Sequence, residues 1–583
     1  MNIIPRCEHP RPDRKREEWL SLNGEWDFEV DNARVGKWKG FCESKSFSEK
    51  IIVPFCPESK LSGLEHTDFM QAVWYRRDFS VPNEWCGKRV FLHIDACDWE
   101  STVYVNGKEV GSHTGGYTPF EFDITDFLSD NGNYVTVYAE DDTRNSMQPT
   151  GKQATSRLEH YGCYYTRNTG IWQSVWLEAK DRAHVISYKA YPNISDASVA
   201  LNVMTSDSAR GKTLRVTASY EGRKMGEAEA KIISSSTTVS IFLSEKHLWE
   251  MGCGRLYDLK FEIVDEDVID VLDGYFGLRE VGLTKSGFTL NGETVFLRFV
   301  LDQGYYPDGI ITAPSDEELK ADIIRSMECG FNGARLHQKV FEPRFLYHAD
   351  KLGYMVFGEY PNWGLDHTRV DSIYSILPEW ICAVDRDFSH PSVIGWCPFN
   401  ETWDLYNRKR AEIVVETVYD VTKAKDPTRP IIADSGSWPT KRGDAHDVHD
   451  YEQDPEIFRQ NYAGAENGLV CDQLYRMDKN RQFFDVNRPV FVSEFGGIKW
   501  VHGKTEDKSW GYGKDVQNEK EFFERLEGLV DSLLENKYII GFCYTQLYDV
   551  ELEQNGFLTY ERVYKFAPER FKKIISKKAV IEE

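Results

Sequence analysis

The sequence predicts a multidomain chain of three units: an all-β sandwich of jelly-roll size, an immunoglobulin-like β-sandwich, and a C-terminal (β/α)8, or TIM, barrel. Its 583 residues are too many for one hydrophobic core. Short strands separated by turn signals fill the chain up to about residue 280, and apolar strands alternate with amphipathic helices after it. We therefore expect units at 1–182, 183–280 and 281–583.

The first unit is predicted from strands at 73–79, 89–94, 101–105, 134–138 and 173–177. Asn106-Gly107 directly follows one of them, and this dipeptide after an alternating run is a strong hairpin signal. In the second unit, alternation continues at 214–218 and 257–263, over a length that suits an immunoglobulin-like sandwich.

Helical periodicity dominates the third unit, at 316–327, which Ser315 is placed to cap, at 411–425 and at 521–526. The length and the alternation are those of a (β/α)8 barrel. Eight strands are expected to start near Phe296, Gly333, Tyr354, Val393, Pro430, Asp447, Pro489 and Ile539.

Charge and hydropathy exclude several classes of partner. The formal charge of −24 disfavours nucleic acid and anionic membranes, which both require a basic face. The N-terminus has no signal-peptide pattern and no 18-residue apolar stretch occurs. The 12 cysteines are scattered without a C-x-x-C pair, so we expect reduced thiols and a cytoplasmic protein.

Polar side chains close the predicted barrel strands. In a (β/α)8 barrel the carboxyl ends of the strands form the active-site rim, so these side chains should converge on one volume. The residues concerned are Asp302, Arg335, His337, Glu359, Asn400, Glu401, Asp434, His449, Tyr451, Glu494, Gln546 and Asp549.

Two of these residues, Glu401 and Glu494, end apolar β-branched runs that form strands four and seven. A carboxylate at the tip of a hydrophobic strand is costly unless it is paired or hydrogen-bonded. Strands four and seven face each other across the barrel mouth, and glycoside hydrolysis needs two carboxyl groups flanking one bond. We predict a separation of about 5–5.5 Å, the value for retaining enzymes.

Several motifs carry a resemblance to a known family over essentially the whole chain. The sequence resembles glycoside hydrolase family 2, the family of β-galactosidases, β-glucuronidases and β-mannosidases. The motifs lie at 22–26, 104–107, 170–176, 331–337 and 390–396, the last running into Asn400-Glu401.

The resemblance implies residue roles and an exo-acting, retaining β-glycosidase. Glu401 is similar to the family's general acid/base, Glu494 to its nucleophile, and Asn400 to the residue that holds the sugar 2-hydroxyl. Arg335 and Tyr451 are the expected donors to Glu494. Binding of the sugar is expected from His337, His449, Asp302, Glu359 and Gln546, with Trp438 as a stacking platform.

The choice of sugar turns on the region after the eighth strand. Family members that act on glucuronides carry Asn-x-Lys there, whereas this chain has Phe557 in place of lysine. That difference favours a β-galactoside. A β-hexuronide, galacturonide or glucuronide, is the alternative if Arg335, Lys339 or Arg562 binds the sugar carboxylate.

Other hypotheses are a non-catalytic carbohydrate-binding protein on the same fold and a metal-dependent barrel hydrolase. We expect no metal and no cofactor, because His446 and His449 stand i,i+3 on a strand and so point to opposite faces. The loop 499–513 is predicted to be a sugar-facing lid, and large enzymes built from sandwiches and a barrel are often homo-oligomers.

Overall fold

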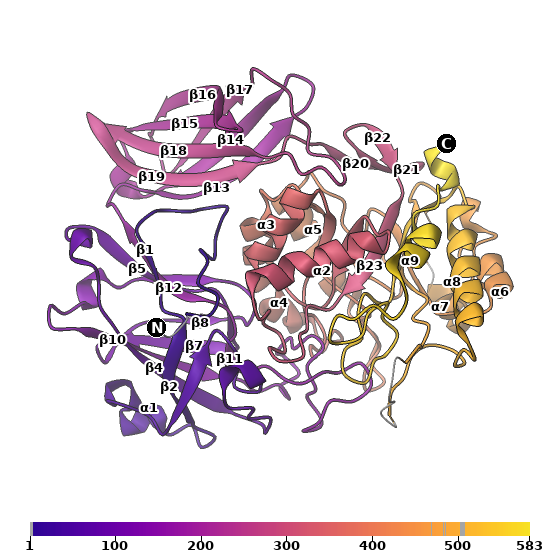
Figure 1. Ribbon diagram of the computed structural model, residues 1–583, viewed down its shortest axis with the longest axis horizontal. Helices are drawn as coiled ribbons and strands as arrows, with labels where there is room; N and C mark the ends of the chain where they lie inside the picture. The colour runs from indigo at the N-terminus through magenta and orange to yellow at the C-terminus, as the bar shows by residue number, and fades with distance from the viewer. Residues whose placement is uncertain (1–3, 468, 482, 484, 502–507) are drawn as a thin grey trace.

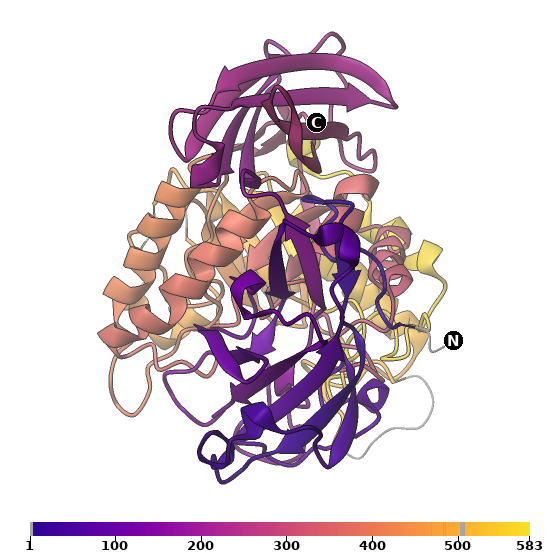
Figure 2. The same ribbon diagram turned by 90° about the vertical axis from the view of Figure 1, so that its left-hand side faces the viewer.

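The computed structural model describes residues 4–583 except 468, 482, 484 and 502–507. Figure 1 shows two β-structures, indigo to purple and magenta, packed beside a helix-rich unit that runs from salmon to yellow. Turned by 90°, Figure 2 places the magenta β-structure at the top and the indigo one below it, in front of the helix-rich unit. The boundaries 1–182, 183–280 and 281–583 remain predictions.

The N-terminal sandwich consists of antiparallel strands in two main sheets around one apolar core. One sheet has the order β1 (Trp19–Ser21), β12 (Val175–Lys180), β5 (Arg89–Ile94) and β9 (Phe120–Asp123). The other has the order β3 (Glu49–Val53), β2 (Gly24–Val30), β4 (Ala72–Phe79), β10 (Asn133–Glu140), β7 (Glu100–Val105) and β8 (Lys108–Thr114). A short pair, β6 (Cys97–Asp98) and β11 (Gly170–Ile171), completes it. The turn between β7 and β8 is Asn106-Gly107, with the two positive φ angles, 52° and 77°, that a tight hairpin needs.

The middle sandwich has two antiparallel sheets around a second apolar core. One sheet has the order β13 (Val185–Asn193), β14 (Ser198–Thr205) and β17 (Ser236–Phe242). The other has the order β16 (Arg223–Lys231), β15 (Thr213–Tyr220), β18 (Tyr257–Asp265) and β19 (Asp267–Phe276). The strands alternate buried and exposed residues, as in β18, where every second side chain enters the core.

The C-terminal unit is a curled parallel sheet that fits a TIM barrel. Its order is β26 (Val393–Cys397), β25 (Met355–Glu359), β24 (Gly333–Leu336), β23 (Leu297–Asp302), β29 (Ile539–Tyr544), β28 (Val490–Phe495) and β27 (His446–Asp450). The helices are α2 (Asp316–Glu328), α3 (Pro343–Leu352), α4 (Ile373–Asp387), α5 (Glu412–Lys425), α6 (Pro455–Asn461), α7 (Gln473–Met477), α8 (Glu519–Leu534) and α9 (Pro568–Ile575). The α2 helix begins as predicted, with the Ser315 side chain accepting a hydrogen bond from the Glu318 N–H.

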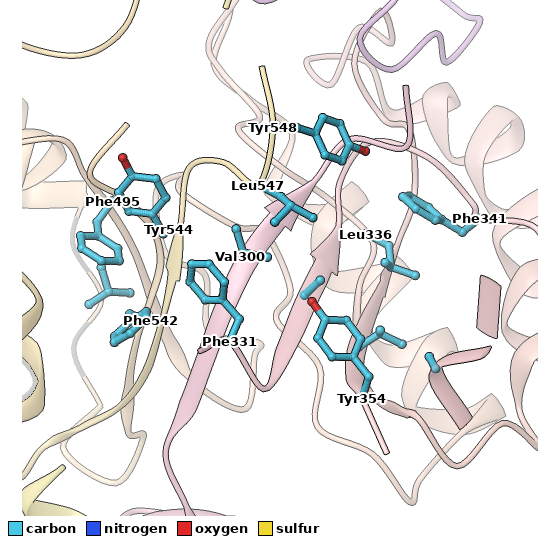
Figure 3. Packing of buried hydrophobic residues seen from close by; sticks show 14 of the residues in the cluster. Val300, Phe331, Leu336, Phe341, Tyr354, Phe495, Phe542, Tyr544, Leu547 and Tyr548 are labelled. Carbon is cyan, nitrogen blue, oxygen red and sulfur yellow. The ribbon is translucent and has the colours of Figure 1, made fainter. Parts of the chain in front are cut away.

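Apolar side chains fill both faces of the barrel strands. Outside, the rings and aliphatic groups of Figure 3 pack between strands and helices, among them Val300 of β23, Phe495 of β28 and Phe542 of β29. Inside, Phe299, Phe357 and Phe491 pack edge to face, 5.3 to 6.3 Å apart. The filled interior forms a floor, so the polar strand ends lie above a rigid apolar layer.

The fifth predicted strand, near Pro430, is not a regular strand among the described residues. Residues 430–435 run beside β26 and make only two isolated bridges, Trp396 with Ile431 and Asn400 with Ser435. On the other side, Asp444 takes both backbone groups of Ile431, the N–H through its carboxylate and the carbonyl through its own N–H. A continuous ladder toward β27 therefore does not form.

A three-stranded sheet, β20 (Val281–Thr284), β21 (Gly287–Leu290) and β22 (Glu293–Val295), joins the middle sandwich to the barrel and packs Phe288 and Leu290 into its apolar floor. In the described ranges, no helix is both long enough and apolar enough to cross a bilayer.

Candidate active site

Glu401 and Glu494 meet at one place above the apolar floor. One carboxylate oxygen of each, together with a ring nitrogen of His449, lies within 4.8 Å of the others. The side chain of Glu494 is 6% exposed and that of Glu401 is 22% exposed. One carboxyl group is therefore buried and the other faces the opening, which gives the two groups different environments.

Glu401 follows β26 in a strained backbone conformation. Its φ is +52°, in the left-handed region that costs a residue with a Cβ about 1–2 kcal/mol. The Glu401 N–H donates to the Ser435 carbonyl at 2.8 Å, so the irregular 430–435 segment holds the residue in place. Strain of this kind persists where the surrounding structure fixes a side chain for function.

Glu494 lies near the end of β28 and is held by two hydrogen-bond donors and one ion-pair partner. Arg335 donates from Nη1 at 3.1 Å, the Tyr451 hydroxyl donates to Oε2, and His449 Nε2 lies 3.4 Å from Oε1. Burial alone would raise the pKa of Glu494, but the charges of His449 and Arg335 outweigh it and lower the pKa to about 2. Glu494 is therefore ionised throughout the neutral range, as a nucleophile requires.

His449, the fourth residue of β27, bridges the two carboxylates. Its Nδ1 lies 2.9 Å from Glu401 Oε1, while its Nε2 faces Glu494 and also lies 2.9 Å from the Ser435 hydroxyl. Burial disfavours the imidazolium, but the Glu494 and Glu401 carboxylates prevail and the pKa of His449 is raised. A protonated His449 thus lies between the two carboxyl groups.

Arg335 of β24 is fully buried and ties the surrounding polar groups together. Its guanidinium donates to Glu359 at 2.5 Å and to Asn400 Oδ1 at 2.9 Å, in addition to Glu494. The same Glu359 contacts His337 Nδ1 at 3.0 Å. With its oxygen taken by Arg335, the buried Asn400 Nδ2 has no hydrogen-bond partner among the described residues, so this donor is left for a ligand.

Three predicted binding residues have other partners. Asp302 accepts hydrogen bonds from the Tyr548 hydroxyl and the Gly304 N–H. Gln546 is fully buried and donates to Asn555 Oδ1 at 2.9 Å. Trp438 is 5% exposed and carries the Arg481 guanidinium 4.6 Å from its ring centroid, which is the environment of a packed ring.

The cations that the sequence offered for a sugar carboxylate are engaged elsewhere. Lys339 donates to the carbonyls of Gly304 and Ile311. Arg562 pairs with Asp322 and covers the Tyr548 ring. Arg335 belongs to the carboxylate network described above. Phe557, which stands where lysine was sought, is buried and stacks on Phe571 at 3.9 Å, so its ring packs in the outer core.

The prediction from strand ends did not include the residues that other segments bring to the barrel mouth. Lys152 and Tyr164 come from the N-terminal sandwich and contact Trp363, which follows β25. Tyr512, from the predicted lid, stacks on Tyr451 at 3.4 Å. Positions 502–507 of that lid lie outside the described residues. Neither segment ends a barrel strand, so barrel periodicity carries no signal for them.

Glu401, His449 and Glu494 also have the spacing of a metal-binding group. Each ring nitrogen of His449, however, already faces one of the carboxylates, and the raised pKa favours the protonated ring, which offers no lone pair. The donor set therefore fits a bridging imidazolium better than a divalent cation.

A cavity of about 800 Å³ opens beside this site rather than over it. Tyr451 forms part of its wall, together with Gln453, Arg476 and Arg525. Its lining is polar and charged, and it lies on the β27 side of the two glutamates.

Comparison with known proteins agrees with the motifs. Residues 19–180 match the family description "Glycosyl hydrolases family 2, sugar binding domain", and residues 183–279 match "Glycosyl hydrolases family 2". A β-galactosidase of Thermoanaerobacter pseudethanolicus is 27% identical over 76% of this chain and 58% of its own length. A β-glucuronidase of Chlorocebus aethiops is 24% identical over 94% of this chain and 88% of its own.

The fold has a close counterpart among solved structures. The β-glucuronidase from Ruminococcus gnavus in complex with D-glucuronic acid superposes with a TM-score of 0.80 at 21% identity, over 98% of this chain and all of that one. The chain spans between a half and three-fifths of the length of some curated relatives, 58% and 52% for two of them. The resemblance inferred from the sequence motifs is confirmed at the level of family.

Proposed function

We propose, since this chain belongs to glycoside hydrolase family 2, that it is an exo-acting β-glycosidase that works with retention of anomeric configuration. The observation that carries the proposal is the approach of the Glu401 and Glu494 carboxylate oxygens to within 4.8 Å. A retaining mechanism needs carboxyl groups about 5–5.5 Å apart, whereas an inverting one needs room for a water molecule between them.

In this mechanism Glu494 attacks the anomeric carbon and Glu401 donates a proton to the glycosidic oxygen, so the aglycone leaves as an alcohol. Water then loses a proton to Glu401 and attacks the same carbon, which frees Glu494. Arg335 and Tyr451 keep Glu494 ionised before attack and stabilise it again on release. The unpaired Asn400 amide is the donor proposed for the sugar 2-hydroxyl.

The proposed substrates are glycosides with a terminal β-linked sugar. A β-galactoside is favoured by the absence of lysine at position 557. The Lys152 ammonium, a cation that the strand-end pattern did not reveal, points instead to a sugar with a carboxylate and supports a β-hexuronide.

The stereochemical course tests the mechanism. Hydrolysis of a chromogenic β-glycoside, followed by proton NMR from the first minute, should show the β-anomer of the free sugar before mutarotation produces the α-anomer. Initial release of the α-anomer would mean inversion and would contradict the proposed roles. Absence of turnover on a panel of aryl β-glycosides and β-uronides would favour a non-catalytic carbohydrate-binding protein instead.

A further inference from the structure

A segment of the N-terminal sandwich reaches the barrel mouth and is fixed there by the barrel. The Thr150 N–H donates to the Trp363 carbonyl at 2.7 Å, and the Gly151 N–H donates to the Pro361 carbonyl at 3.2 Å. Farther along, the Tyr165 hydroxyl donates to Glu553 at 2.6 Å. These contacts hold the segment at both ends against loops that follow β25 and β29. The residue between them, Lys152, is therefore positioned by the barrel.

Lys152 is 6% exposed and points its ammonium group over the Trp363 ring, with Nζ 4.1 Å from the ring centroid. The indole nitrogen of that same ring donates to the Asn400 carbonyl at 3.1 Å. One ring thus separates the ammonium from the residue that precedes Glu401. The ammonium is also near enough to Glu494 and Glu401 for their charges to act on it.

The ammonium of Lys152 differs from those of other buried lysines. Lys339 donates to two carbonyls, and Lys565 pairs with Asp549 at 2.6 Å. For Lys152, by contrast, the described part of the chain shows neither an ion pair within 4.0 Å nor a hydrogen bond from Nζ. A buried charge without a counter-ion in direct contact is costly and calls for a reason.

Lys152 is nevertheless charged in the free protein. Burial lowers the pKa of the ammonium, but Cys163 and the carboxylates of Glu553, Glu494 and Glu401 act together to raise it. The cation therefore lies in the field of Glu494 and Glu401 and, among the residues that the structure describes, forms an ion pair with neither of them.

We propose that Lys152 is a specificity-determining residue that binds the carboxylate of a hexuronic acid bound at Glu401 and Glu494. The inference rests on the proposed glycosidase function. An anionic sugar supplies the missing direct partner of the ammonium, through a charge-assisted hydrogen bond. The cation comes from the N-terminal sandwich, not from the Asn-x-Lys position, where this chain has Phe557.

A different role for Lys152 would be to tune the catalytic glutamates by its charge. The two roles differ in what they do to specificity. A tuning charge affects neutral and acidic sugars alike, whereas a carboxylate-binding residue changes their ratio.

The experiment compares kcat/KM on 4-nitrophenyl β-glucuronide, β-galacturonide and β-galactoside for the wild type, Lys152→Met and Lys152→Arg. In Lys152→Met the ratio of the preferred uronide to the galactoside should fall by about ten- to a hundredfold, the loss typical of one charge-assisted contact. Lys152→Arg keeps the charge and should retain part of the ratio. Arg157→Met, which removes an exposed cation from the same segment, is the matched control and should leave the ratio unchanged.

The methyl ester of the preferred uronide completes a double-mutant cycle. Esterification of the uronide should lower the kcat/KM of the wild type by about the same factor as the substitution Lys152→Met does on the free acid. It should lower the kcat/KM of Lys152→Met little further. A thermal unfolding midpoint close to that of the wild type verifies that the variant is folded.

Several outcomes would overturn the inference. Equal losses on uronide and galactoside would assign Lys152 to tuning, and turnover of neutral sugars alone by the wild type would exclude an acidic substrate while leaving the glycosidase proposal intact. Absence of turnover of every sugar would remove both proposals together.

Discussion

At the scale of the residue, the site depends on one imidazole between two carboxylates. His449 contacts Glu401 through Nδ1 and Glu494 through Nε2, and Arg335 adds a second positive charge next to Glu494. Two carboxylates this close would otherwise repel, and one of them would take up a proton. The cations keep Glu494 ionised, and Glu401 is the more exposed of the two carboxyl groups.

The substitution His449→Gln should shift the pH dependence of catalysis. Loss of the imidazolium raises the pKa of Glu494 from about 2 toward its ordinary value. Because the nucleophile works ionised, activity is lost as pH falls through that pKa, so the acidic limb of kcat/KM should move to higher pH. The same change at His247, in the middle sandwich, should leave the limb in place. An unmoved limb in His449→Gln would contradict this electrostatic role.

The substitution Glu401→Ala should separate substrates by leaving group. Without a proton donor, glycosides with poor leaving groups should lose about 10²–10⁴-fold in rate. Activated aryl glycosides should lose far less once sodium azide replaces water in the second step, and β-glycosyl azide should form. Glu412→Ala, on the exposed face of α5, is the control. Equal losses on both substrates, with no azide product, would count against Glu401 as the acid/base.

At the scale of the element, strand ends determine which side chains meet. Arg335, Glu359 and Glu494 lie in β24, β25 and β28, so the predicted alternation was sufficient to bring them together. The fifth strand failed as a prediction because Asp444 takes the backbone groups that a ladder would use. The apolar residues near position 430 indicate a buried segment, but they do not reveal that Asp444 competes for its backbone groups.

Gly436, in the segment that replaces the fifth strand, makes room for His449. Its φ is +66°, and a Cβ there would lie 2.0 Å from His449 Nδ1. Gly436→Ala should therefore displace the imidazole and lower kcat by about tenfold or more. Gly40→Ala is the matched control, because Gly40 has a similar φ of +71° with no atom near the added methyl. Similar kcat values for the two variants would show that the His449 position is unimportant.

At the scale of the whole molecule, the site is assembled from more than the barrel. Lys152 and Tyr164 come from the N-terminal sandwich, hundreds of residues from Glu494 in the sequence. The barrel rim could be predicted because strand ends in one repeating fold converge. The sandwich segment could not, because its place at the mouth depends on hydrogen bonds between domains, such as Thr150 to Trp363.

Buried acids accumulate where the N-terminal sandwich meets the barrel. Burial raises the pKa of Glu58 to about 8 and that of Asp98 to about 7, and Glu379 of α4, which accepts from the Tyr117 N–H at 2.6 Å, has a pKa raised to about 7. The folded protein therefore holds these protons at a pH where the unfolded chain has released them.

Because the pKa values of these buried acids are raised, we predict that the stability of the folded protein falls as pH rises. Between the ordinary pKa of Glu58, 4.5, and its folded value of about 8, the unfolding free energy should decrease by up to about 1.4 kcal/mol per pH unit for this group. Glu58→Gln should remove that part of the slope, so its thermal midpoint should exceed that of the wild type more at pH 8 than at pH 5. Glu84→Gln, at an exposed position, should follow the wild type. Parallel midpoints for Glu58→Gln and the wild type would contradict a buried neutral Glu58.

Chelation tests the choice of an imidazolium over a metal at the site. Because both ring nitrogens of His449 face the carboxylates, activity should be unchanged after incubation with EDTA and gel filtration. Loss of activity that zinc or magnesium restores would assign Glu401, His449 and Glu494 to an ion instead.

The central claim is that Glu494 becomes bonded to the sugar while Glu401 faces it across the same anomeric carbon. The most direct measurement is incubation with a 2-deoxy-2-fluoro β-glycoside carrying a good leaving group, followed by peptide mass spectrometry. We expect one added fluorosugar, located on Glu494, and slow recovery of activity when an acceptor is added. A sugar attached to any other residue, or inactivation with no covalent product, would contradict the assignment.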